Sequence, residues 1–217
     1  MSLIIGIDGP AGSGKGTITK IIAEKLGIVN IDTGAMYRCV ALASIRNNLS
    51  LDDKDKIVEL AKKVEIKFDE EGHTYLDGED VSSLIRTPEV SKIVSPLSSI
   101  VEVRHEMVNQ QRKLAEGLSV IMEGRDITTV VFPNATYKFY LDASVEERAR
   151  RRYLQNQESG IEMSYEEILD NIKKRDYNDM HKEEGSLMRT KDQIYIDSTD
   201  LTIDEVVDEF MKYIKER

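Results

Sequence analysis

The sequence is short of cysteine, of basic charge and of long apolar runs, and each shortage excludes a class of protein. Cys39 is the only cysteine, so no internal disulfide can form; we expect a packed core thiol and a reducing compartment. The 30 basic residues are outnumbered by 40 acidic ones, giving a net charge of −10, whereas nucleic-acid-binding proteins usually carry a basic excess. No apolar run approaches the ~18 residues of a membrane span, and residues 3–7 are too few for a signal peptide. We therefore expect a soluble, cytoplasmic protein that contacts neither nucleic acid nor membrane. We also expect a monomer, although composition does not fix the oligomeric state.

The most informative stretch is residues 3–17, which read LIIGIDGPAGSGKGT. The apolar start predicts a buried strand, and a helical pattern follows Lys15. Glycines let several backbone N–H groups face one side, and a helix N-terminus adds its positive dipole end. This context predicts a phosphate-binding loop, with Lys15 at the β- and γ-phosphates and the Thr17 hydroxyl near the phosphates and Mg²⁺. The alternative is a glycine-rich turn with a solvated lysine. The predicted nucleotide-binding residues are Gly9, Pro10, Ala11, Gly12, Ser13, Gly14, Lys15, Gly16 and Thr17.

Apolar periodicity along the rest of the 217 residues predicts strands that alternate with helices, as in one α/β domain. Strands are expected at residues 28–31, 118–122, 137–141 and 193–196, and helices at residues 15–26, 32–47, 52–63, 87–99, 100–117, 164–179 and 202–215. A further helix should begin at Ser144, with Glu147 completing a capping box, and give way to a mobile loop at residues 156–164. Pro96 should break its helix. Such alternation indicates a central parallel sheet with helices on both faces.

Residues 65–80 have a different pattern, EIKFDEEGHTYLDGED, in which apolar and polar residues alternate. Turn signals stand at residues 71–72 and 77–78. The pattern predicts a small antiparallel hairpin or three-stranded piece, inserted between the helices of the main fold.

Each predicted core strand ends in polar residues, and the carboxyl ends of parallel strands share one edge of the sheet. The phosphate-binding loop, Asp32, residues 123–126 and Asp142 should therefore lie along that edge. A second substrate that carries a phosphate could face the loop there. Arg38 and Arg125 are suited to hold it, because a guanidinium matches phosphate oxygens bidentately. The alternative for each arginine is a surface ion pair.

An arginine cluster follows the fourth strand and precedes the polar loop. We predict that Arg148, Arg151 and Arg152 neutralise charge during phosphoryl transfer from a mobile lid, and that Arg150 faces solvent. The alternative is a solvated helix face paired with neighbouring glutamates.

Arg175 and Asp179 are four residues apart and should share a helix face. They could form a helical salt bridge or contact a ribose and its phosphate. The three histidines, at positions 73, 105 and 181, have no metal-ligand spacing, so we propose no structural metal site from them.

Six stretches together resemble the bacterial cytidylate kinase family, which phosphorylates a nucleoside monophosphate. They read IDGPAGSGKGT (7–17), DTGAMYR (32–38), GEDVSSLIRTPEVS (78–91), EGRDITTVVFP (123–133), FYLDASVEERARRR (139–152) and KRDYND (174–179). The resemblance implies a single P-loop kinase domain over residues 1–217, with a core at 1–34, 117–152 and 180–217. It also implies an NMP-binding region at 35–116 with an inserted β lobe at 64–81, and a lid with its adjoining helix at 153–179.

The resemblance implies ATP-dependent phosphorylation of CMP and dCMP, with Mg²⁺ as cofactor, and it implies a role for each matching residue. The acceptor phosphate would contact Thr33, Arg38 and Arg125, the cytosine Ser95, Arg104 and Asp126, and the ribose Arg175 and Asp179. Lys182 stands where the family often has an arginine on the phosphate, and Thr128 where a glycine is usual. Gly16 follows the lysine, where the general loop pattern has serine or threonine; nucleoside monophosphate kinases carry this variant. Thr17 and Glu123 would lie near Mg²⁺, through water.

The expected reaction is in-line transfer of the γ-phosphoryl group of ATP to a CMP phosphate oxygen. No general base is needed, because that oxygen is already anionic near neutral pH. Catalysis would come from positioning and from neutralisation of charge by Lys15, Arg125, Mg²⁺ and the lid arginines. Two other functions fit the sequence: a P-loop kinase of another acceptor, such as UMP or a small alcohol, and a nucleotide-dependent switch.

Overall fold

The computed structural model describes residues 2–69 and 71–214, and its centre is a five-stranded parallel sheet. The strands are β1 (Ile4–Asp8), β2 (Val29–Asp32), β6 (Val120–Gly124), β7 (Tyr137–Asp142) and β8 (Ile194–Asp197), in the order β2-β6-β1-β7-β8. Every adjacent pair is parallel. The predicted core strands are thus confirmed, although β6 begins two residues later than expected and continues to Gly124.

The inner strands of the sheet, β6, β1 and β7, are largely buried on both faces, which is why their sequences are mainly apolar. Strand β6 shows this directly, since successive side chains of a strand point to opposite faces. Val120 and Met122 belong to the larger core cluster, and Ile121 between them belongs to the smaller one.

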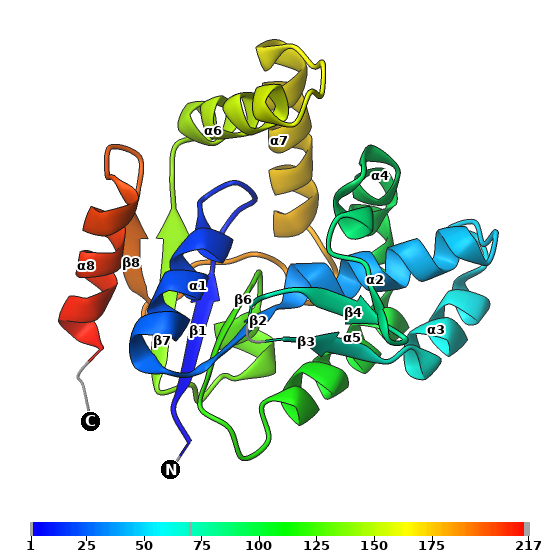
Figure 1. Ribbon diagram of the computed structural model, residues 1–217, viewed down its shortest axis with the longest axis horizontal. Helices are drawn as coiled ribbons and strands as arrows, with labels where there is room; N and C mark the ends of the chain where they lie inside the picture. The colour runs from blue at the N-terminus through cyan, green and yellow to red at the C-terminus, as the bar shows by residue number, and fades with distance from the viewer. Residues whose placement is uncertain (1, 70, 215–217) are drawn as a thin grey trace.

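Eight α-helices surround the sheet in the described part of the chain (Figure 1). They are α1 (Lys15–Leu26), α2 (Thr33–Arg46), α3 (Lys54–Lys63), α4 (Pro88–Leu97), α5 (Val101–Leu114), α6 (Val145–Glu158), α7 (Tyr165–Met180) and α8 (Ile203–Tyr213). Helices α1 and α8 contribute to the smaller core cluster, and α2 to α5 contribute to the larger one. Two short turns, η1 (Leu84–Arg86) and the π-helical η2 (Ile127–Val131), were not predicted. Lys215, at the expected end of the last helix, lies outside the described residues.

Three local predictions were wrong. Helix α4 continues through Pro96 and ends one residue later, at Leu97. A proline disrupts the turn that it joins, but so close to the end of a helix there is little helix left to disrupt. Helix α6 extends to Glu158, so that the predicted loop at residues 156–164 shrinks to residues 159–164. Ser144 does cap α6 through its hydroxyl, but the carboxylate of Glu147 pairs with Arg150 and Arg151 and makes no reciprocal capping bond.

The inserted piece is a three-stranded antiparallel sheet, as predicted. Its strands are β3 (Ile66–Phe68), β4 (Thr74–Leu76) and β5 (Glu79–Asp80), in that order. Glu70, within the predicted piece, lies outside the described residues. A bidentate ion pair between Arg46 of α2 and Glu79 of β5 joins this sheet to the main fold.

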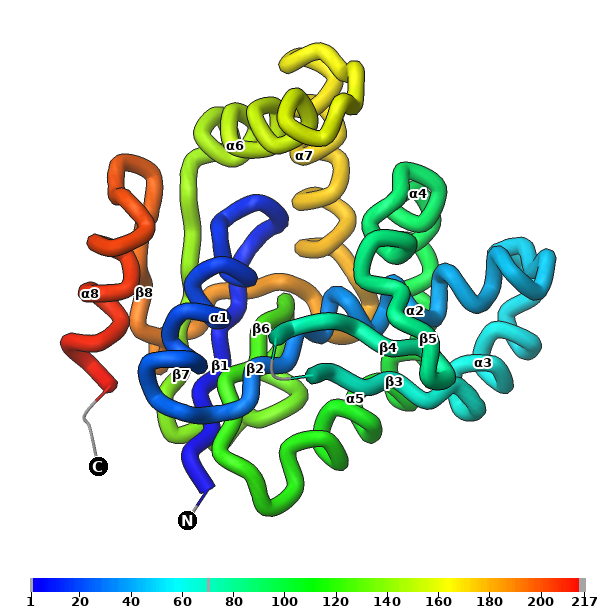
Figure 2. Tube along the Cα trace, viewed as in Figure 1, coloured from blue at the N-terminus to red at the C-terminus, as the bar shows by residue number. Residues whose placement is uncertain are grey.

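Helix α6 lies beyond the carboxyl ends of the strands, above the loop that follows β1, and α7 runs down from the level of α6 (Figure 2). A hydrogen bond from the guanidinium of Arg148 in α6 to the carbonyl of Ala11 in that loop confirms the contact. None of the helices in residues 2–69 and 71–214 combines the length and apolar character of a membrane span.

Candidate active site

The loop of residues 9–14 leads directly from β1 into α1, as the strand–loop–helix pattern predicted. Gly12 and Gly14 adopt left-handed conformations, with φ of +80° and +92°, and Gly14 stands at the N-cap of α1. Because Gly14 has no side chain to cap the helix, the first N–H groups of α1 are left for another partner. Together with the positive end of the helix dipole, they form a ready-made site for an anion.

Lys15 is buried beneath this loop. Its Nζ donates to the carbonyl oxygens of Gly9 at 2.8 Å and Pro10 at 2.7 Å. Burial and the charge of Arg125 hold the pKa of Lys15 well below its usual range, and Glu123 opposes them. An anion in the loop would favour the charged form of Lys15, because an opposite charge offsets desolvation.

The structure gives a steric reason for a glycine at position 16, which the sequence alone did not reveal. A Cβ on Gly16 would lie 3.0 Å from Oε1 of Glu123, which reaches the start of α1 from the end of β6. The glycine therefore makes room for a buried carboxylate beside the loop. Burial and the charge of Asp32 raise the pKa of Glu123, while Lys15 and Arg125 lower it. Thr17, one position further along α1, is exposed.

Cations from α2, η1, α7 and the residue after β6 converge on the space in front of the loop. Arg38 in α2 donates to the carbonyl of Ile85 at 3.1 Å and to Oγ of Ser91 at 2.9 Å. Burial and the charges of Arg175 and Arg86 lower the pKa of Arg38 to about 10. Mutual repulsion of this kind among cations means that an anion bound between them would be stabilised.

Arg86, in η1, is one member of this group that sequence reasoning missed. It forms an ion pair with Asp32 at 3.5 Å and its charge acts on Arg38. The only signal in the sequence was its place within the stretch at residues 78–91 that carries part of the family resemblance.

Asp179 in α7 holds three of the predicted substrate residues together. It pairs with Nε of Arg125 at 2.9 Å, Nζ of Lys182 at 3.0 Å and Nε of Arg175 at 3.9 Å. Burial alone would raise the pKa of Asp179, but the three cations outweigh it and hold that pKa far below its usual range. Arg175 and Asp179 thus do share a helix face, yet the closest cation comes from the end of β6.

Arg104 and Asp126 form a buried ion pair between α5 and the residue after Arg125. The Arg104 guanidinium also donates to the carbonyl of Ser98 at 3.3 Å, and Lys182 donates to Oγ of Ser98 at 3.0 Å. Burial raises the pKa of Asp126, although Arg104 opposes the shift. The guanidinium of Arg104 favours the ionised carboxylate of Asp126, which accepts hydrogen bonds and does not donate them.

Two predicted substrate residues carry buried polar atoms without a hydrogen-bond partner among the described residues. They are Oγ of Ser95 and Nε of Arg175. Buried polar atoms are nearly always satisfied in native proteins, so each such exception needs an explanation. A polar ligand bound between α4 and α7 would give both atoms a hydrogen-bond partner.

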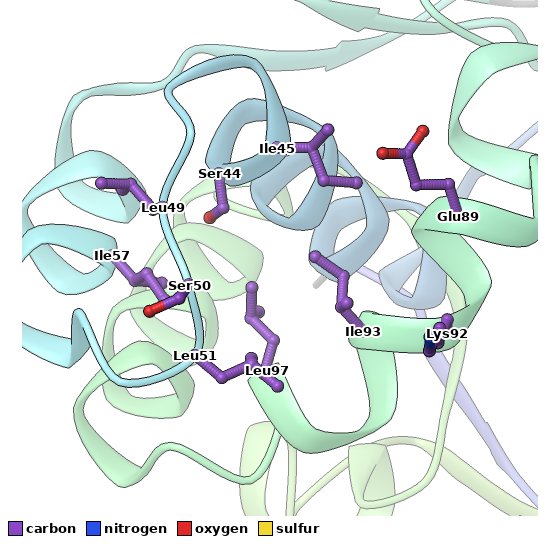
Figure 3. Close-up of a pocket in the computed structure, with 10 residues that line it drawn as sticks. All are labelled: Ser44, Ile45, Leu49, Ser50, Leu51, Ile57, Glu89, Lys92, Ile93 and Leu97. Atoms are coloured by element: carbon purple, nitrogen blue, oxygen red, sulfur yellow. The ribbon is translucent and has the colours of Figure 1, made fainter.

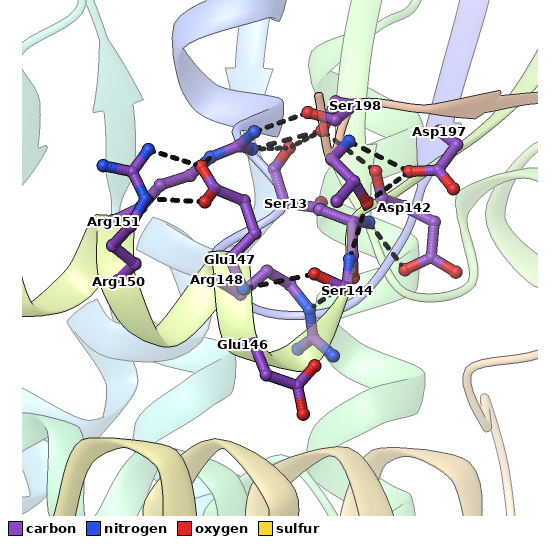
Figure 4. A network of polar contacts seen from close by, with 12 residues as sticks. Ser13, Asp142, Ser144, Glu146, Glu147, Arg148, Arg150, Arg151, Asp197 and Ser198 are labelled. Carbon is purple, nitrogen blue, oxygen red and sulfur yellow. Dashed lines mark hydrogen bonds and ion pairs between the residues drawn. The ribbon is translucent and has the colours of Figure 1, made fainter. Parts of the chain in front are cut away.

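The predicted lid arginines do not behave alike (Figure 4). Arg148 is buried and pairs with Asp176 at 2.7 Å, in addition to its bond to Ala11. Arg151 donates to the carbonyl of Ser198 at 2.5 Å and to that of Ser13 at 3.5 Å. Arg148 is therefore fixed to the phosphate-binding loop, and Arg151 is fixed both to that loop and to Ser198, the residue after β8.

The other two arginines of the cluster are exposed. Arg152 donates to Oε1 of Gln155 at 2.8 Å, and Arg150 forms a two-bond ion pair with Glu147. The expected solvent exposure of Arg150 is confirmed, and the role of Arg152 in catalysis stays a prediction.

Thr33 and Thr128 are both engaged at the ends of the central strands. Thr33 Oγ1 donates to the carbonyl of Glu123 at 2.6 Å. Thr128 Oγ1 donates to Asp8 at 2.6 Å and accepts from Gln193 at 2.6 Å. Thr128 thus ties η2 to β1. Sequence reasoning missed Asp8 and Gln193, because residues 185 positions apart give no local signal of contact.

A separate pocket of about 370 Å³ lies between α2, α3 and α4 (Figure 3). Its apolar lining includes Leu49, Ile57, Ile93 and Leu97. No predicted site residue lines it, so it is distinct from the space in front of the phosphate-binding loop.

Comparison with known proteins gives a consistent result. A model of the cytidylate kinase family matches residues 5–216. The chain is 51% identical over 215 residues to cytidylate kinase of Caldanaerobacter subterraneus subsp. tengcongensis, spanning 99% of this chain and 96% of that protein. It is 49% identical over 211 residues to cytidylate kinase of Caldicellulosiruptor bescii, spanning 96% and 93%. Shikimate kinase from Bacteroides thetaiotaomicron, at 13% identity, shares the fold with a TM-score of 0.51 over 97% of both chains.

The chain thus matches one family over nearly its whole length, and it contains the loop after β1, the converging cations and the small antiparallel sheet. The chain belongs to the cytidylate kinase family.

Proposed function

We propose that this protein transfers the γ-phosphoryl group of ATP to CMP and dCMP, forming CDP and dCDP. The proposal rests on the position of two groups of residues that lie side by side. The phosphate-binding loop faces a group of cations from α2, η1, α7 and the end of β6, and the buried Arg104–Asp126 pair lies beside that group. One anion fits the loop and a second fits the cations, as transfer between two phosphates requires.

The Asp126 carboxylate supports a substrate base that is a pyrimidine with an exocyclic amino group. A carboxylate accepts a hydrogen bond from the amino group of cytosine, whereas the carbonyl at the same place in uracil offers only another acceptor. Buried hydrogen-bond matching of this kind discriminates strongly between substrates. Ser95 Oγ, buried without a partner among the described residues, is a further group for the base to satisfy.

Phosphoryl transfer needs positioning and charge neutralisation more than proton transfer. Lys15 and Arg125 would both neutralise charge on the transferred group, since they lie near enough for their charges to act on each other in the folded chain. Arg148 and Arg151 would act through the loop that they contact. We assign residues 35–116 to binding of the monophosphate, and residues 153–179 to the lid and its adjoining helix. Closure would exclude water that could otherwise hydrolyse ATP.

The donors present are compatible with Mg²⁺. No group of three or more His, Cys, Asp or Glu side chains suited to a metal occurs in the described residues, and Mg²⁺ at kinase sites is held mainly by phosphates and water with one or two protein ligands. Thr17 and Glu123 would complete its shell, directly or through water. When bound, Mg²⁺ would neutralise phosphate charge. The single buried thiol suits the cytoplasm, and one copy of the chain supplies every residue invoked, so we propose a monomer.

The test is ADP release from ATP–Mg²⁺ with CMP, dCMP, UMP, AMP or no acceptor. Release with CMP and dCMP alone is the expected result. Equal release with UMP would point to a broader pyrimidine kinase, and release without acceptor would point to a hydrolase or switch.

Asp126→Asn tests the base-reading role in the same assay. We expect the preference for CMP over UMP to fall by roughly 10- to 100-fold, because the amide can also donate to the uracil carbonyl. Asp170→Asn, on the exposed face of α7, is the control. Full preference for CMP in Asp126→Asn would refute this role.

A further inference from the structure

The chain after α7 crosses the Arg104–Asp126 pair and is fastened at several points. We call residues 181–187 the strap. Lys182 contacts Asp179 and Ser98, as described above, and Glu184 pairs with Nε2 of His105 in α5 at 2.7 Å. Leu187 is buried and its N–H donates to the carbonyl of Asp179 at 2.7 Å. The strap is therefore anchored to α5, to α7 and to the end of α4.

Gly185 is the point where the strap touches the ion pair. A Cβ built on Gly185 would lie 2.5 Å from Oδ2 of Asp126 and closer still to the guanidinium of Arg104. These separations are far below van der Waals contact, so a side chain at this position requires a neighbouring group to shift. Gly185 also has φ of +63°, a left-handed conformation that favours glycine.

The guanidinium of Arg104 cannot simply swing away from a side chain at Gly185. It is 4% exposed, it donates to Ser98, and it lies 5.8 Å from the ring centre of Tyr37. A side chain at position 185 would have to move the Arg104–Asp126 pair or lift the strap from it.

We propose that Gly185 is a positioning residue for the choice of base. Its backbone closes one side of the Arg104–Asp126 pair, keeps water from it and fixes the direction in which the Asp126 carboxylate accepts a hydrogen bond. In the water-poor surroundings of a buried site, a correctly aimed acceptor discriminates strongly and a misplaced one does not. The ligand class is a pyrimidine monophosphate with an exocyclic amino group, so this inference rests on the proposed function.

Gly185→Ala tests the proposal, with Gly27→Ala as a matched control. Gly27, after α1, has the same φ of +63°, but a Cβ there would meet nothing within 4 Å. Both variants therefore strain the backbone alike, and only Gly185→Ala crowds the ion pair. We expect Gly185→Ala to lower the kcat/KM ratio of CMP over UMP by roughly 10- to 100-fold with the KM for ATP unchanged, and Gly27→Ala to keep the ratio. An unchanged ratio in Gly185→Ala, or an equal fall in both variants, would overturn the proposal.

The Arg104→Ala/Asp126→Ala background separates positioning from general damage. If Gly185 acts through this pair, adding Gly185→Ala to that background changes the ratio by less than about twofold. A further large fall would show that the strap acts elsewhere and would overturn the proposal. Failure of the proposed function is recognisable separately, since the unaltered chain would then show no preference for CMP.

Discussion

Replacement of Asp179 by asparagine should destabilise the fold more than any other single loss of an acidic side chain at the site, because Asp179 compensates three cations. Its side chain is 4% exposed, and that of Lys182 is 5% exposed. Asp179→Asn keeps the shape and removes the charge, which leaves Lys182 and Arg125 without their closest counter-charge. Breaking a buried pair in this way costs about 3–5 kcal/mol. Such a loss is a large fraction of the ~5–15 kcal/mol that holds a typical domain together.

The pH dependence of the effect has a definite sign. The pKa of Asp179 is lower in the folded chain than in the unfolded one. The stability that it contributes is therefore fully present above the unfolded value of ~3.9 and is lost as the pH falls through the folded-state pKa. The difference in unfolding free energy between the two proteins should stay constant from about pH 8 to about pH 5 and shrink below about pH 4.

Urea denaturation followed by circular dichroism over this pH range measures the difference. Asp170→Asn is the matched control, because Asp170 lies on the same helix in an exposed pair with Lys174 at 2.6 Å. An exposed pair of this kind should cost less than about 0.5 kcal/mol. A loss below about 1 kcal/mol in Asp179→Asn, or a difference that does not shrink in acid, would refute the reasoning.

Two further predictions follow from burial. Burial raises the pKa of the Cys39 thiol to about 12. Iodoacetamide near pH 8 should therefore leave Cys39 unmodified in the native protein and alkylate it in urea, which mass spectrometry would show. Prompt alkylation of the native protein would contradict this prediction. Arg148→Ala should cost about 3–5 kcal/mol of unfolding free energy and most of the activity, because it leaves Asp176 buried without its cation and frees the phosphate-binding loop. Arg150→Ala, at an exposed pair, should change stability by less than about 1 kcal/mol, and equal losses in the two variants would disprove the assignment.

The parts of the fold that the sequence predicted are those with a local or periodic signal. Apolar runs marked all five core strands, and the change to alternation at residues 65–80 marked the small antiparallel sheet. The errors were also local. The sequence offered two uses of the Glu147 carboxylate, a reciprocal cap and a pairing with the arginines, and could not decide between them, because both lie within about one helical turn.

Residue types at fixed short spacings were enough to predict the phosphate-binding loop, the alternation of strands and helices, and the family. Which groups meet at the site depends on how the chain folds. Arg125 and Asp179 are 54 residues apart, and Gly185 touches Arg104 and Asp126 from a segment with no pattern of its own. These contacts exist because parallel strands bring their carboxyl ends to one edge and the chain returns across it, and that geometry belongs to the folded sheet as a whole.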